Sequence, residues 1–375
     1  MNLLKVATIV GTRPEIIRLS RIMAKLEEYC NHTCIHTGQN YDPNLSDVFF
    51  RQLQIRSPDY NLNCARETAI QTIANTLVEV DKVLESVNPD AVLVLGDTNS
   101  CLSVLAAKKR KIPVFHIEAG NRSFDFRVPE EINRRLVDQL SDVNMTYSDI
   151  SREHLIKENF RQDMVVKVGS PLKEVAEYFK DQIAQSDVLQ TLNILPNNYF
   201  VVSVHREENV DSKQNLKSVC MILNELCEKY KKPIIFSTHP RTRKRLEDGE
   251  FVLNKLINLH EPFGYLDYIK LQKESFCVIS DSGSINEESS IFGLKSINLR
   301  ESSERPEAME EGISIMSGLA VDNVLASVHA TVLMNQNKLP SEVKDYSSEN
   351  VSDKVVKILY SYTHLVRRET WKIAQ

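Results

Sequence analysis

The sequence contains no hydrophobic run that approaches the roughly 20 residues a membrane-spanning helix requires. Its start, MNLLKVATIV, leads into GTRPE and not into a small-residue cleavage site, so we expect no signal peptide. The net charge is −5 and long Lys/Arg runs are missing, which disfavours nucleic acid as a partner. We therefore expect a cytoplasmic protein with neither a membrane nor a nucleic-acid partner.

Paired cysteines and common cofactor signatures are also missing. The seven cysteines form an odd set without CxxC spacing, and several lie in apolar runs, which indicates reduced, buried thiols. No His/Cys/Asp cluster has zinc spacing, and Asp281 is better explained as a cap than as a ligand of a divalent ion. The absence of GxGxxG disfavours a dinucleotide cofactor, and the absence of GxxxxGK[ST] excludes a P-loop.

What the sequence does contain is a repeated alternation of short apolar runs with amphipathic segments. The runs predict strands at 6–10, 33–37, 91–95, 114–117, 142–147, 165–168, 200–204, 233–237, 256–259, 277–280 and 295–299. Among the helical segments between them, 68–87 is the clearest. Such βα units in a row predict an α/β fold of doubly wound parallel sheets.

The chain is long enough for two domains, since 375 residues exceed what one hydrophobic core usually serves. The segment 172–196 is less apolar and shows no strand pattern, so we expect the domain boundary there. Residues 1–170 are expected to form an N-terminal Rossmann-like domain and residues 171–350 a second one, with strand ends of both lining a cleft. The last helix, about 351–375, is a candidate to pack back on the first domain.

The stretch from Val114 to Arg134 joins a strand to a helix and carries acidic residues at both ends. Glu118 ends the strand, and Glu130 follows Pro129 in the first turn of the expected helix. Strand carboxyl ends and helix amino ends share one side of an open sheet, where ligands bind. Two carboxyl groups there suit proton transfer, although each could equally cap its own element.

Other strand ends offer groups for an anionic ligand. Arg13 lies in the turn after the first strand, beside helix amides, where the alternative is a surface pairing. The segment from Ser282 to Ser284 precedes a helix and suits a phosphate, and Glu288, four residues on, suits ribose hydroxyls. Asp97 and His205 end two further strands, and for His205 we favour a functional role over a structural one.

Several short motifs are spread over nearly the whole chain. They are GTRPE (11–15), HTGQ (36–39), GDT (96–98), HIEAG (116–120), PEEINR (129–134), HREEN (205–209), DSG (281–283) with Glu287 and Glu288, and ERPE (304–307). In kind and order they resemble the bacterial UDP-N-acetylglucosamine 2-epimerase family. The resemblance implies the two-domain GT-B fold and an enzyme without a metal or nicotinamide cofactor. Such enzymes eliminate UDP from a UDP-sugar and add it back with C2 inverted.

The resemblance also assigns roles to matching positions. Asp97, Glu118 and Glu130 match the family's catalytic carboxylates, and His205 its active-site histidine near the diphosphate. The matching substrate- or UDP-binding positions are Arg13, Arg18, His239, Tyr268, Ser282, Gly283, Ser284, Glu288 and Arg305. The implied partners are a UDP-sugar substrate and a second copy in a homodimer.

Some positions depart from the family pattern. Glu207 stands where a second Arg is usual, Asn40 where His is usual and Arg18 where Lys is usual, and the loop 120–129 looks short. With these departures, the motif variants HREENVDS and SERPEAMEE resemble one branch of the family. Members of that branch make UDP-N-acetyl-L-fucosamine from UDP-2-acetamido-2,6-dideoxy-L-talose, for capsule or O-antigen synthesis. The alternative substrate is UDP-N-acetylglucosamine. More distant alternatives are a GT-B glycosyltransferase and a nucleotide-sugar sensor without turnover.

Overall fold

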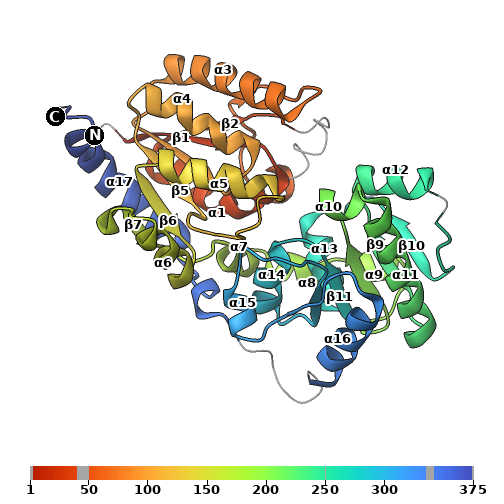
Figure 1. Cartoon of the computed structure of the whole chain (residues 1–375). Coiled ribbons are helices and arrows are strands. Elements are labelled where there is room, and N and C mark those ends of the chain that lie inside the picture. Colours follow the sequence, from red (N-terminus) through yellow and green to blue (C-terminus); the bar gives the residue numbers. More distant parts are fainter. Residues whose placement is uncertain (1–2, 40–49, 250, 335–341, 374–375) are drawn as a thin grey trace. The chain divides into compact units, whose positions relative to one another are not determined.

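The chain divides into two compact units in the computed structural model, which describes residues 3–39, 50–249, 251–334 and 342–373 (Figure 1). Unit 1 comprises Met1–Glu177 together with Lys344–Gln375, and unit 2 comprises Tyr178–Val343. The chain therefore leaves unit 1 once and returns to it at the end. Each unit is built on a parallel sheet of its own.

The sheet of unit 1 has seven parallel strands, and its order reverses between β1 and β4. From edge to edge they are β3 (Tyr60–Asn61), β2 (Asn31–His36), β1 (Lys5–Val10), β4 (Ala91–Leu95), β5 (Val114–Ile117), β6 (Val143–Thr146) and β7 (Val165–Lys167). Every residue of β4 is buried, as expected of a central parallel strand with helices on both faces. The reversal between β1 and β4 is a topological switch point, where open α/β sheets bind ligands.

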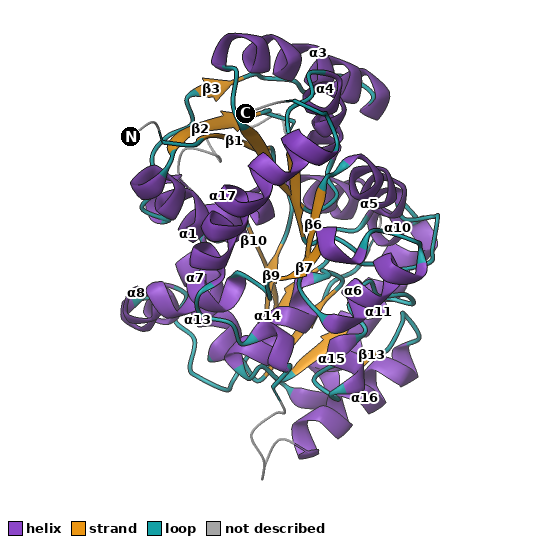
Figure 2. Cartoon of the chain, turned by 90° about the vertical axis from the view of Figure 1, so that its left-hand side faces the viewer, coloured by secondary structure: helices purple, strands orange, loops and turns teal. Residues whose placement is uncertain are grey.

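Helices connect the strands of unit 1 and flank its sheet (Figure 2). They are α1 (Arg13–Tyr29), α3 (Ala69–Val87), α4 (Val104–Lys109), α5 (Pro129–Leu140), α6 (Asp149–Lys157), α7 (Leu172–Tyr178) and α17 (Val351–Glu369), with 3₁₀ turns η1 (Asn99–Ser103), η2 (Gln162–Met164) and η3 (Lys344–Tyr346). Helix α3 begins where a capping box predicts, because Thr68 and Gln71 exchange hydrogen bonds of 3.2 Å with each other's amides. Helix α17 packs on α1, and its Val355, Leu359 and Val366 are buried.

The sheet of unit 2 has six parallel strands and reverses between β8 and β11. From edge to edge they are β10 (Ile257–His260), β9 (Ile234–Ser237), β8 (Phe200–Ser203), β11 (Cys277–Ser280), β12 (Ser296–Asn298) and β13 (Ile315–Met316). The helices of this unit are α8 (Lys180–Gln185), α9 (Val188–Thr191), α10 (Glu207–Val210), α11 (Lys213–Tyr230), α12 (Pro240–Asp248), α13 (Tyr265–Lys273), α14 (Ser284–Phe292), α15 (Glu307–Glu310) and α16 (Val321–Met334).

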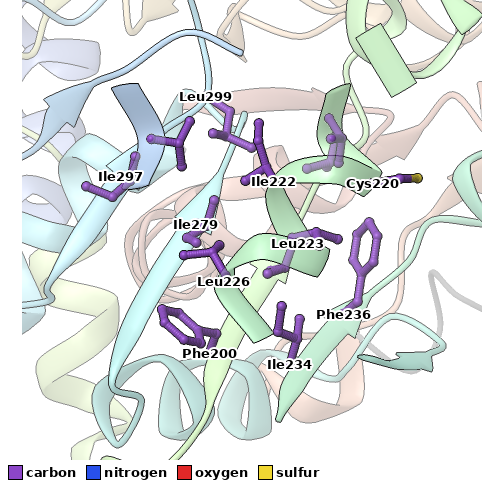
Figure 3. Close-up of a cluster of buried hydrophobic side chains, with 14 of the residues drawn as sticks. Phe200, Cys220, Ile222, Leu223, Leu226, Ile234, Phe236, Ile279, Ile297 and Leu299 are labelled. Atoms are coloured by element: carbon purple, nitrogen blue, oxygen red, sulfur yellow. The ribbon is translucent and has the colours of Figure 1, made fainter. Parts of the chain in front are cut away.

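A large apolar cluster between α11 and the sheet holds unit 2 together (Figure 3). The apolar positions of α11 recur at helical spacing, so Ile222, Leu223 and Leu226 fall on one face and pack on Phe200 and Ile279 of the strands. Each such side chain is fully buried, and burial of a residue of this size contributes about 1.5–3 kcal/mol. The core therefore fixes the sheet whose strand ends carry the candidate ligand groups.

The observed elements confirm the expected α/β fold class of doubly wound, Rossmann-like parallel sheets. Every strand that the sequence predicts is present, with small shifts at the ends. The short strands β3 and β13 and the helices α6, α12 and α16 were not predicted, and the segment 172–196 forms three short helices, α7 to α9. The sequence also predicts a helix that runs through Phe49 and Phe50, and most of it lies outside the described residues.

Two expectations drawn from what the sequence lacks can be compared with the structure. All seven cysteines are free and buried, as predicted, and desolvation raises the pKa of the Cys34 and Cys277 thiols to about 12. Within the described residues, no helix combines the length and the apolarity that crossing a membrane requires.

Candidate active site

The residues that the sequence marks at strand ends lie at the switch point of each sheet. In unit 1, Gly11 follows β1 and Asp97 follows β4, and these two strands are hydrogen-bonded neighbours. In unit 2, His205 follows β8, and the segment from Ser282 to Ser284 follows the neighbouring β11. Each unit therefore presents a candidate ligand site at the position where open α/β sheets bind their ligands.

Glu15 occupies the switch point of unit 1. Its buried carboxylate accepts hydrogen bonds from the amides of Gly11 (2.8 Å) and Thr12 (2.6 Å) and from the Thr98 hydroxyl (2.7 Å). Desolvation raises the pKa of Glu15 against the effect of these hydrogen bonds. The sequence led us to expect free helix amides beside Arg13. The amides of Gly11 and Thr12, which precede the helix, are bound by Glu15 of its first turn.

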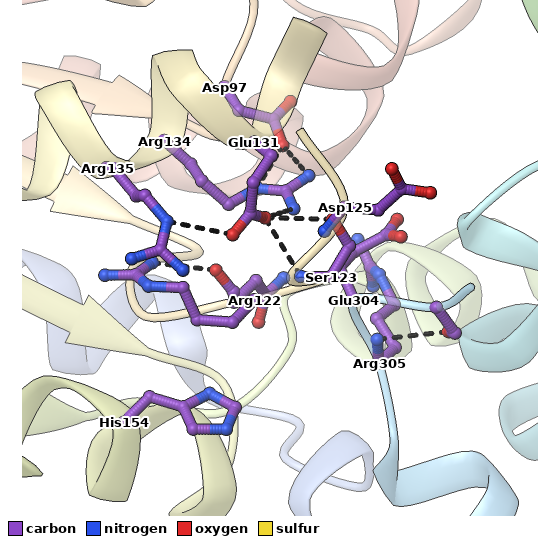
Figure 4. A network of polar contacts seen from close by, with 12 residues as sticks. Asp97, Arg122, Ser123, Asp125, Glu131, Arg134, Arg135, His154, Glu304 and Arg305 are labelled. Atoms are coloured by element: carbon purple, nitrogen blue, oxygen red, sulfur yellow. Dashed lines mark hydrogen bonds and ion pairs between the residues drawn. The ribbon is translucent and has the colours of Figure 1, made fainter. Parts of the chain in front are cut away.

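Asp97 is held in place by a buried arginine of α5 (Figure 4). Arg134 donates from Nε (3.0 Å) and from a terminal nitrogen (2.7 Å), and both bonds reach Oδ2 of Asp97. The side-chain amide of Asn133, the preceding residue of α5, donates to the Asp97 carbonyl at 2.9 Å. Helix α5 thus fixes both the backbone and the carboxylate of Asp97.

Glu118 directly follows β5, the neighbour of β4, so it lies at the strand end beside that of Asp97. Its backbone adopts φ +70°, a left-handed conformation that is uncommon for a residue other than glycine and often marks a functional constraint. The buried Arg18 of α1 places its Nε 3.9 Å from the Glu118 carboxylate. Arg18, expected to bind substrate, therefore pairs with an expected catalytic residue.

The two adjacent glutamates of α5 differ in environment. Glu130, expected to be catalytic, is half-buried in the first turn of the helix. Glu131 is fully buried and accepts from the Ser123 amide (2.9 Å), Arg134 (2.7 Å) and Arg135 (2.9 Å). Burial opposes its ionisation, but the Ser123 amide and Arg134 outweigh that effect and lower the pKa of Glu131. Glu131 thus ties the loop before α5 to the arginine that holds Asp97.

In unit 2, Asp281 organises the turn that carries His205. Its fully buried carboxylate accepts from the amides of His205 (3.1 Å) and Arg206 (3.0 Å) and from the Asn209 side chain (3.0 Å). The same carboxylate lies 3.4 Å from Nδ1 of the exposed His205 ring. The sequence led us to expect that Asp281 caps the helix after its own strand, but its carboxylate holds the turn after β8 instead.

The Ser282–Ser284 turn opens helix α14. The Ser282 amide donates to Ser280 Oγ at 3.0 Å, the Ser284 amide to Ser282 Oγ at 3.3 Å, and the two outer hydroxyls lie 2.9 Å apart. A Cβ atom on Gly283 between them would lie 2.1 Å from Oε1 of Glu304, so a side chain there would have to displace that carboxylate. A phosphate at this helix start would exchange the local hydroxyl contacts for its own.

Helices α13 and α14 hold the residues expected near the nucleoside. Glu288 of α14 is half-buried and accepts from the Gln272 side chain of α13 at 2.8 Å. Tyr268, also on α13, is half-buried against an apolar cluster that includes Tyr199 and Leu271. Gln272 therefore orients the carboxylate that the sequence assigns to ribose hydroxyls.

The remaining two expected ligand residues of unit 2 have clear local partners. Arg305 is buried and forms an ion pair with Glu287 of α14. His239 caps α12, where its Nδ1 accepts from the Arg241 amide at 3.3 Å. Desolvation, together with the charges of His205 and Arg241, lowers the pKa of His239. In this arrangement Nδ1 of His239 carries no proton, so the ring is neutral and its proton lies on Nε2.

Sequence reasoning did not foresee which residues hold the site in place, and it named Asp281 only as a cap. Arg134, Glu131 and Asp281 bind the backbone or the carboxylates of predicted site residues, and Glu15 closes the first turn. Each of them lies inside one of the quoted motifs, which is the signal that could have found them. Among the described residues, no group of three His, Cys, Asp or Glu side chains is arranged to hold a metal ion.

Comparison with known proteins identifies the family. A family model described as UDP-N-acetylglucosamine 2-epimerase matches residues 24–360. A solved UDP-N-acetylglucosamine 2-epimerase from Rickettsia bellii is 44% identical, with a TM-score of 0.92 over 99% of this chain and 100% of its own.

Two further proteins match along nearly their whole length. The solved Methanocaldococcus jannaschii UDP-GlcNAc 2-epimerase, in complex with UDP-GlcNAc and UDP, is 36% identical with a TM-score of 0.89, covering 96% of this chain and 100% of its own. The UDP-2,3-diacetamido-2,3-dideoxy-D-glucuronate 2-epimerase of Pseudomonas aeruginosa is 34% identical over 88% of this chain and 92% of its own. The chain therefore belongs to the UDP-N-acetylglucosamine 2-epimerase family and is an enzyme of the isomerase class.

Proposed function

We propose that the protein inverts C2 of a UDP-2-acetamido sugar by eliminating UDP and adding it back. In the first half, a base takes the C2 proton, the C–H electron pair forms the C1=C2 bond of a glycal, and the C1–O bond breaks to release UDP. In the second half, a proton reaches C2 from the opposite face and a UDP oxygen bonds again to C1. The C2 proton is weakly acidic, so proton removal and leaving-group stabilisation have to act together.

The observation that carries the proposal is the pair of carboxylates at adjacent strand ends of unit 1. Asp97 follows β4 and Glu118 follows β5, and these strands pair in register from Val92↔Val114 to Leu95↔Ile117. Arg134 donates two hydrogen bonds to Oδ2 of Asp97, and we assign the other oxygen, Oδ1, to the proton. Glu118, in its strained backbone, is the second proton-transfer group, and Glu130 at the start of α5 is the third.

The residues of unit 2 supply the proposed UDP site. The Ser282–Ser284 turn and His205 are assigned to the diphosphate, Glu288 to the ribose and Tyr268 to the uracil ring. Support comes from their place at the second switch point and from the M. jannaschii relative, whose structure holds UDP. Arg13, Arg18, His239 and Arg305 are assigned to the substrate by their match to the family motifs.

The sugar is either UDP-2-acetamido-2,6-dideoxy-L-talose or UDP-N-acetylglucosamine. The motif variants favour the 6-deoxy sugar, and the names of the most similar relatives slightly favour UDP-N-acetylglucosamine. Glu207, one of the departures from the family pattern, is weaker evidence about the sugar than the sequence implied. Its carboxylate forms an ion pair with Arg241 at 2.6 Å within unit 2. Another, Asn40, lies outside the described residues. We retain the 6-deoxy sugar, a precursor for capsule or O-antigen, as the proposed substrate of a cytoplasmic homodimer.

Proton exchange at C2 tests both the reaction and the sugar. Each UDP-sugar is incubated with the protein in D2O, and the C2 proton signal is followed by NMR. We expect exchange with the 6-deoxy-L-talose derivative. Exchange with UDP-N-acetylglucosamine alone would correct the sugar and keep the reaction. No exchange with either, or release of UDP only when a sugar acceptor is added, would refute the reaction and favour a glycosyltransferase.

A further inference from the structure

His116 lies directly beneath the proposed catalytic strand ends and has no place in the reaction described above. Its ring is fully buried in β5, with Nε2 2.8 Å from the Gly96 carbonyl oxygen and Nδ1 2.9 Å from Oδ1 of Asp138. Gly96 precedes Asp97, and Glu118 lies two residues beyond the histidine. The ring therefore links β5, which leads to Glu118, to the end of β4, which leads to Asp97.

Both ring nitrogens of His116 face hydrogen-bond acceptors. The Gly96 carbonyl has no proton to donate, so Nε2 has to carry one. Asp138 accepts from a terminal nitrogen of Arg122 at 2.7 Å and from the Gly120 amide at 3.3 Å, as an ionised carboxylate does. A proton on Nδ1 as well would make the ring an imidazolium that donates to Asp138 from one side and to Gly96 from the other.

The surrounding charges accommodate a cationic ring. Arg122 binds Asp138 with one nitrogen and both oxygens of Glu158 with two others, at 2.8 and 2.6 Å. Arg122, His116 and Asp138 are all buried. Glu158 is half-buried and also pairs with Arg135 at 3.4 Å, so Asp138 is the buried carboxylate that faces the ring directly.

We propose that His116, as a permanent imidazolium clamped by Asp138, is the positioning residue that sets Asp97 relative to Glu118. It fixes the Gly96 carbonyl and hence the turn that carries Asp97, while Asp138 fixes the Gly120 amide on the far side of Glu118. Asp138 lies on α5, the helix whose Arg134 binds the Asp97 carboxylate. The kinetic part of the proposal rests on the proposed function, and the protonation part does not.

NMR of the full-length protein tests the protonation directly. Histidine is labelled with ¹⁵N, and ring nitrogens are observed at a pH well above the range in which an ordinary histidine titrates. The His116 signals are identified by their loss in His116→Gln. We expect both nitrogens to show the protonated signature, whereas His239, whose Nδ1 accepts from an amide, provides the contrasting neutral pattern. One unprotonated nitrogen in His116 would overturn the proposal, whether or not the enzyme is active.

Two substitutions separate positioning from general stability. Glutamine places an amide near Nε2 and can still donate to Gly96, whereas asparagine places one near Nδ1 and donates to Asp138 instead. We expect His116→Asn to lower kcat about a hundredfold with little change in KM, as a displaced catalytic group would, and His116→Gln to recover much of that loss. Equal kcat in both variants, or a change confined to KM, would overturn the positioning role.

His32→Asn is the matched control. His32 is also buried in the sheet of unit 1 and bonds Thr8 Oγ1 at 3.0 Å, near the start of its strand and away from the strand ends. We expect it to lower the melting temperature without lowering kcat. If His32→Asn lowered kcat as much as His116→Asn, the effect would be one of stability and the proposal would fail. A wild-type protein without epimerase activity would refute the proposed function alone, because the NMR result still decides the protonation state.

Discussion

Asp97 and Glu118 carry the first prediction at the residue scale. Replacing either by its amide, Asp97→Asn or Glu118→Gln, removes a proton-transfer group and keeps the side-chain volume. We expect kcat to fall at least about a hundredfold, the usual scale for a general acid or base. The fall in kcat is measured from the turnover of the preferred UDP-sugar. Asp81→Asn, which removes an ion pair with Arg110 on the surface of unit 1, is the matched control and is expected to keep its kcat. Near-normal turnover in both active-site variants would refute the assignment.

Gly283 gives a second prediction at this scale. In Gly283→Ala the new methyl group would meet Glu304 Oε1, and that carboxylate is buried and held by Arg300 at 2.7 Å, so it cannot easily move away. We expect the affinity for UDP, measured by calorimetry, to fall by about tenfold or more, which corresponds to about 1.4 kcal/mol.

Gly293→Ala provides the comparison on the same helix. Gly293 ends α14 at φ +66°, so alanine there is strained and lowers stability. It is expected to leave UDP affinity nearly unchanged. If both variants lost affinity equally, the close contact of Gly283 would not be the cause.

Individual residues show where prediction from sequence ends. Asp97, Glu118 and His205 could be predicted to lie at strand ends. Apolar runs indicate the strands, and the polar residues that follow each run mark where the strand ends. Their partners could not be placed, since Arg134 and Asp281 meet them only after the sheet has formed. Glu15 combines both cases: its bonds to the Gly11 and Thr12 amides are local, whereas the Thr98 hydroxyl reaches it only through the fold.

At the scale of elements, the loop from Ser123 to α5 is tied down by Glu131. Its pKa is lowered in the folded state, so the stabilisation is complete above the unfolded pKa and is lost as the pH falls through the folded pKa. We expect Glu131→Gln to lower the free energy of unfolding by about 1–3 kcal/mol at neutral pH. Urea denaturation over a pH series should show this difference shrinking on acidification.

Glu153→Gln is the comparison for that pH series. Glu153 pairs with Lys157 on the exposed surface of α6, and surface pairs contribute little. We expect a much smaller change than for Glu131→Gln at every pH. A difference for Glu131→Gln that stayed constant into acid would contradict the ionic explanation.

A helix or strand could be predicted from the sequence when it contains enough apolar residues to form a pattern. The buried strand β4 matches its prediction because its five residues are all apolar. The two-residue strands β3 and β13 are too short to form a pattern, and α12, PRTRKRLED, is too polar to show an apolar stripe. The start of α12 rests instead on His239 and Pro240, a cap and a first-turn proline, which are weaker signals.

At the scale of the whole molecule, α17 is the piece of unit 1 that follows unit 2 in sequence. Its Leu359 is fully buried, and Leu359→Ala is expected to destabilise unit 1 by about 2–5 kcal/mol. Calorimetry of the intact chain should show an earlier transition for unit 1, while the transition that UDP shifts, assigned to unit 2, keeps its temperature. Lys357→Ala, on the exposed face of the same helix, should leave both transitions in place. If only the UDP-sensitive transition shifted, the assignment of α17 to unit 1 would be wrong.

The return of the chain to unit 1 also orders events during translation. The flank of α1 that α17 covers stays bare while the ribosome is still making unit 2, because α17 is the last helix to emerge. We expect nascent chains stalled before residue 344 to bind chaperones through unit 1, although every strand of its sheet has already been synthesised.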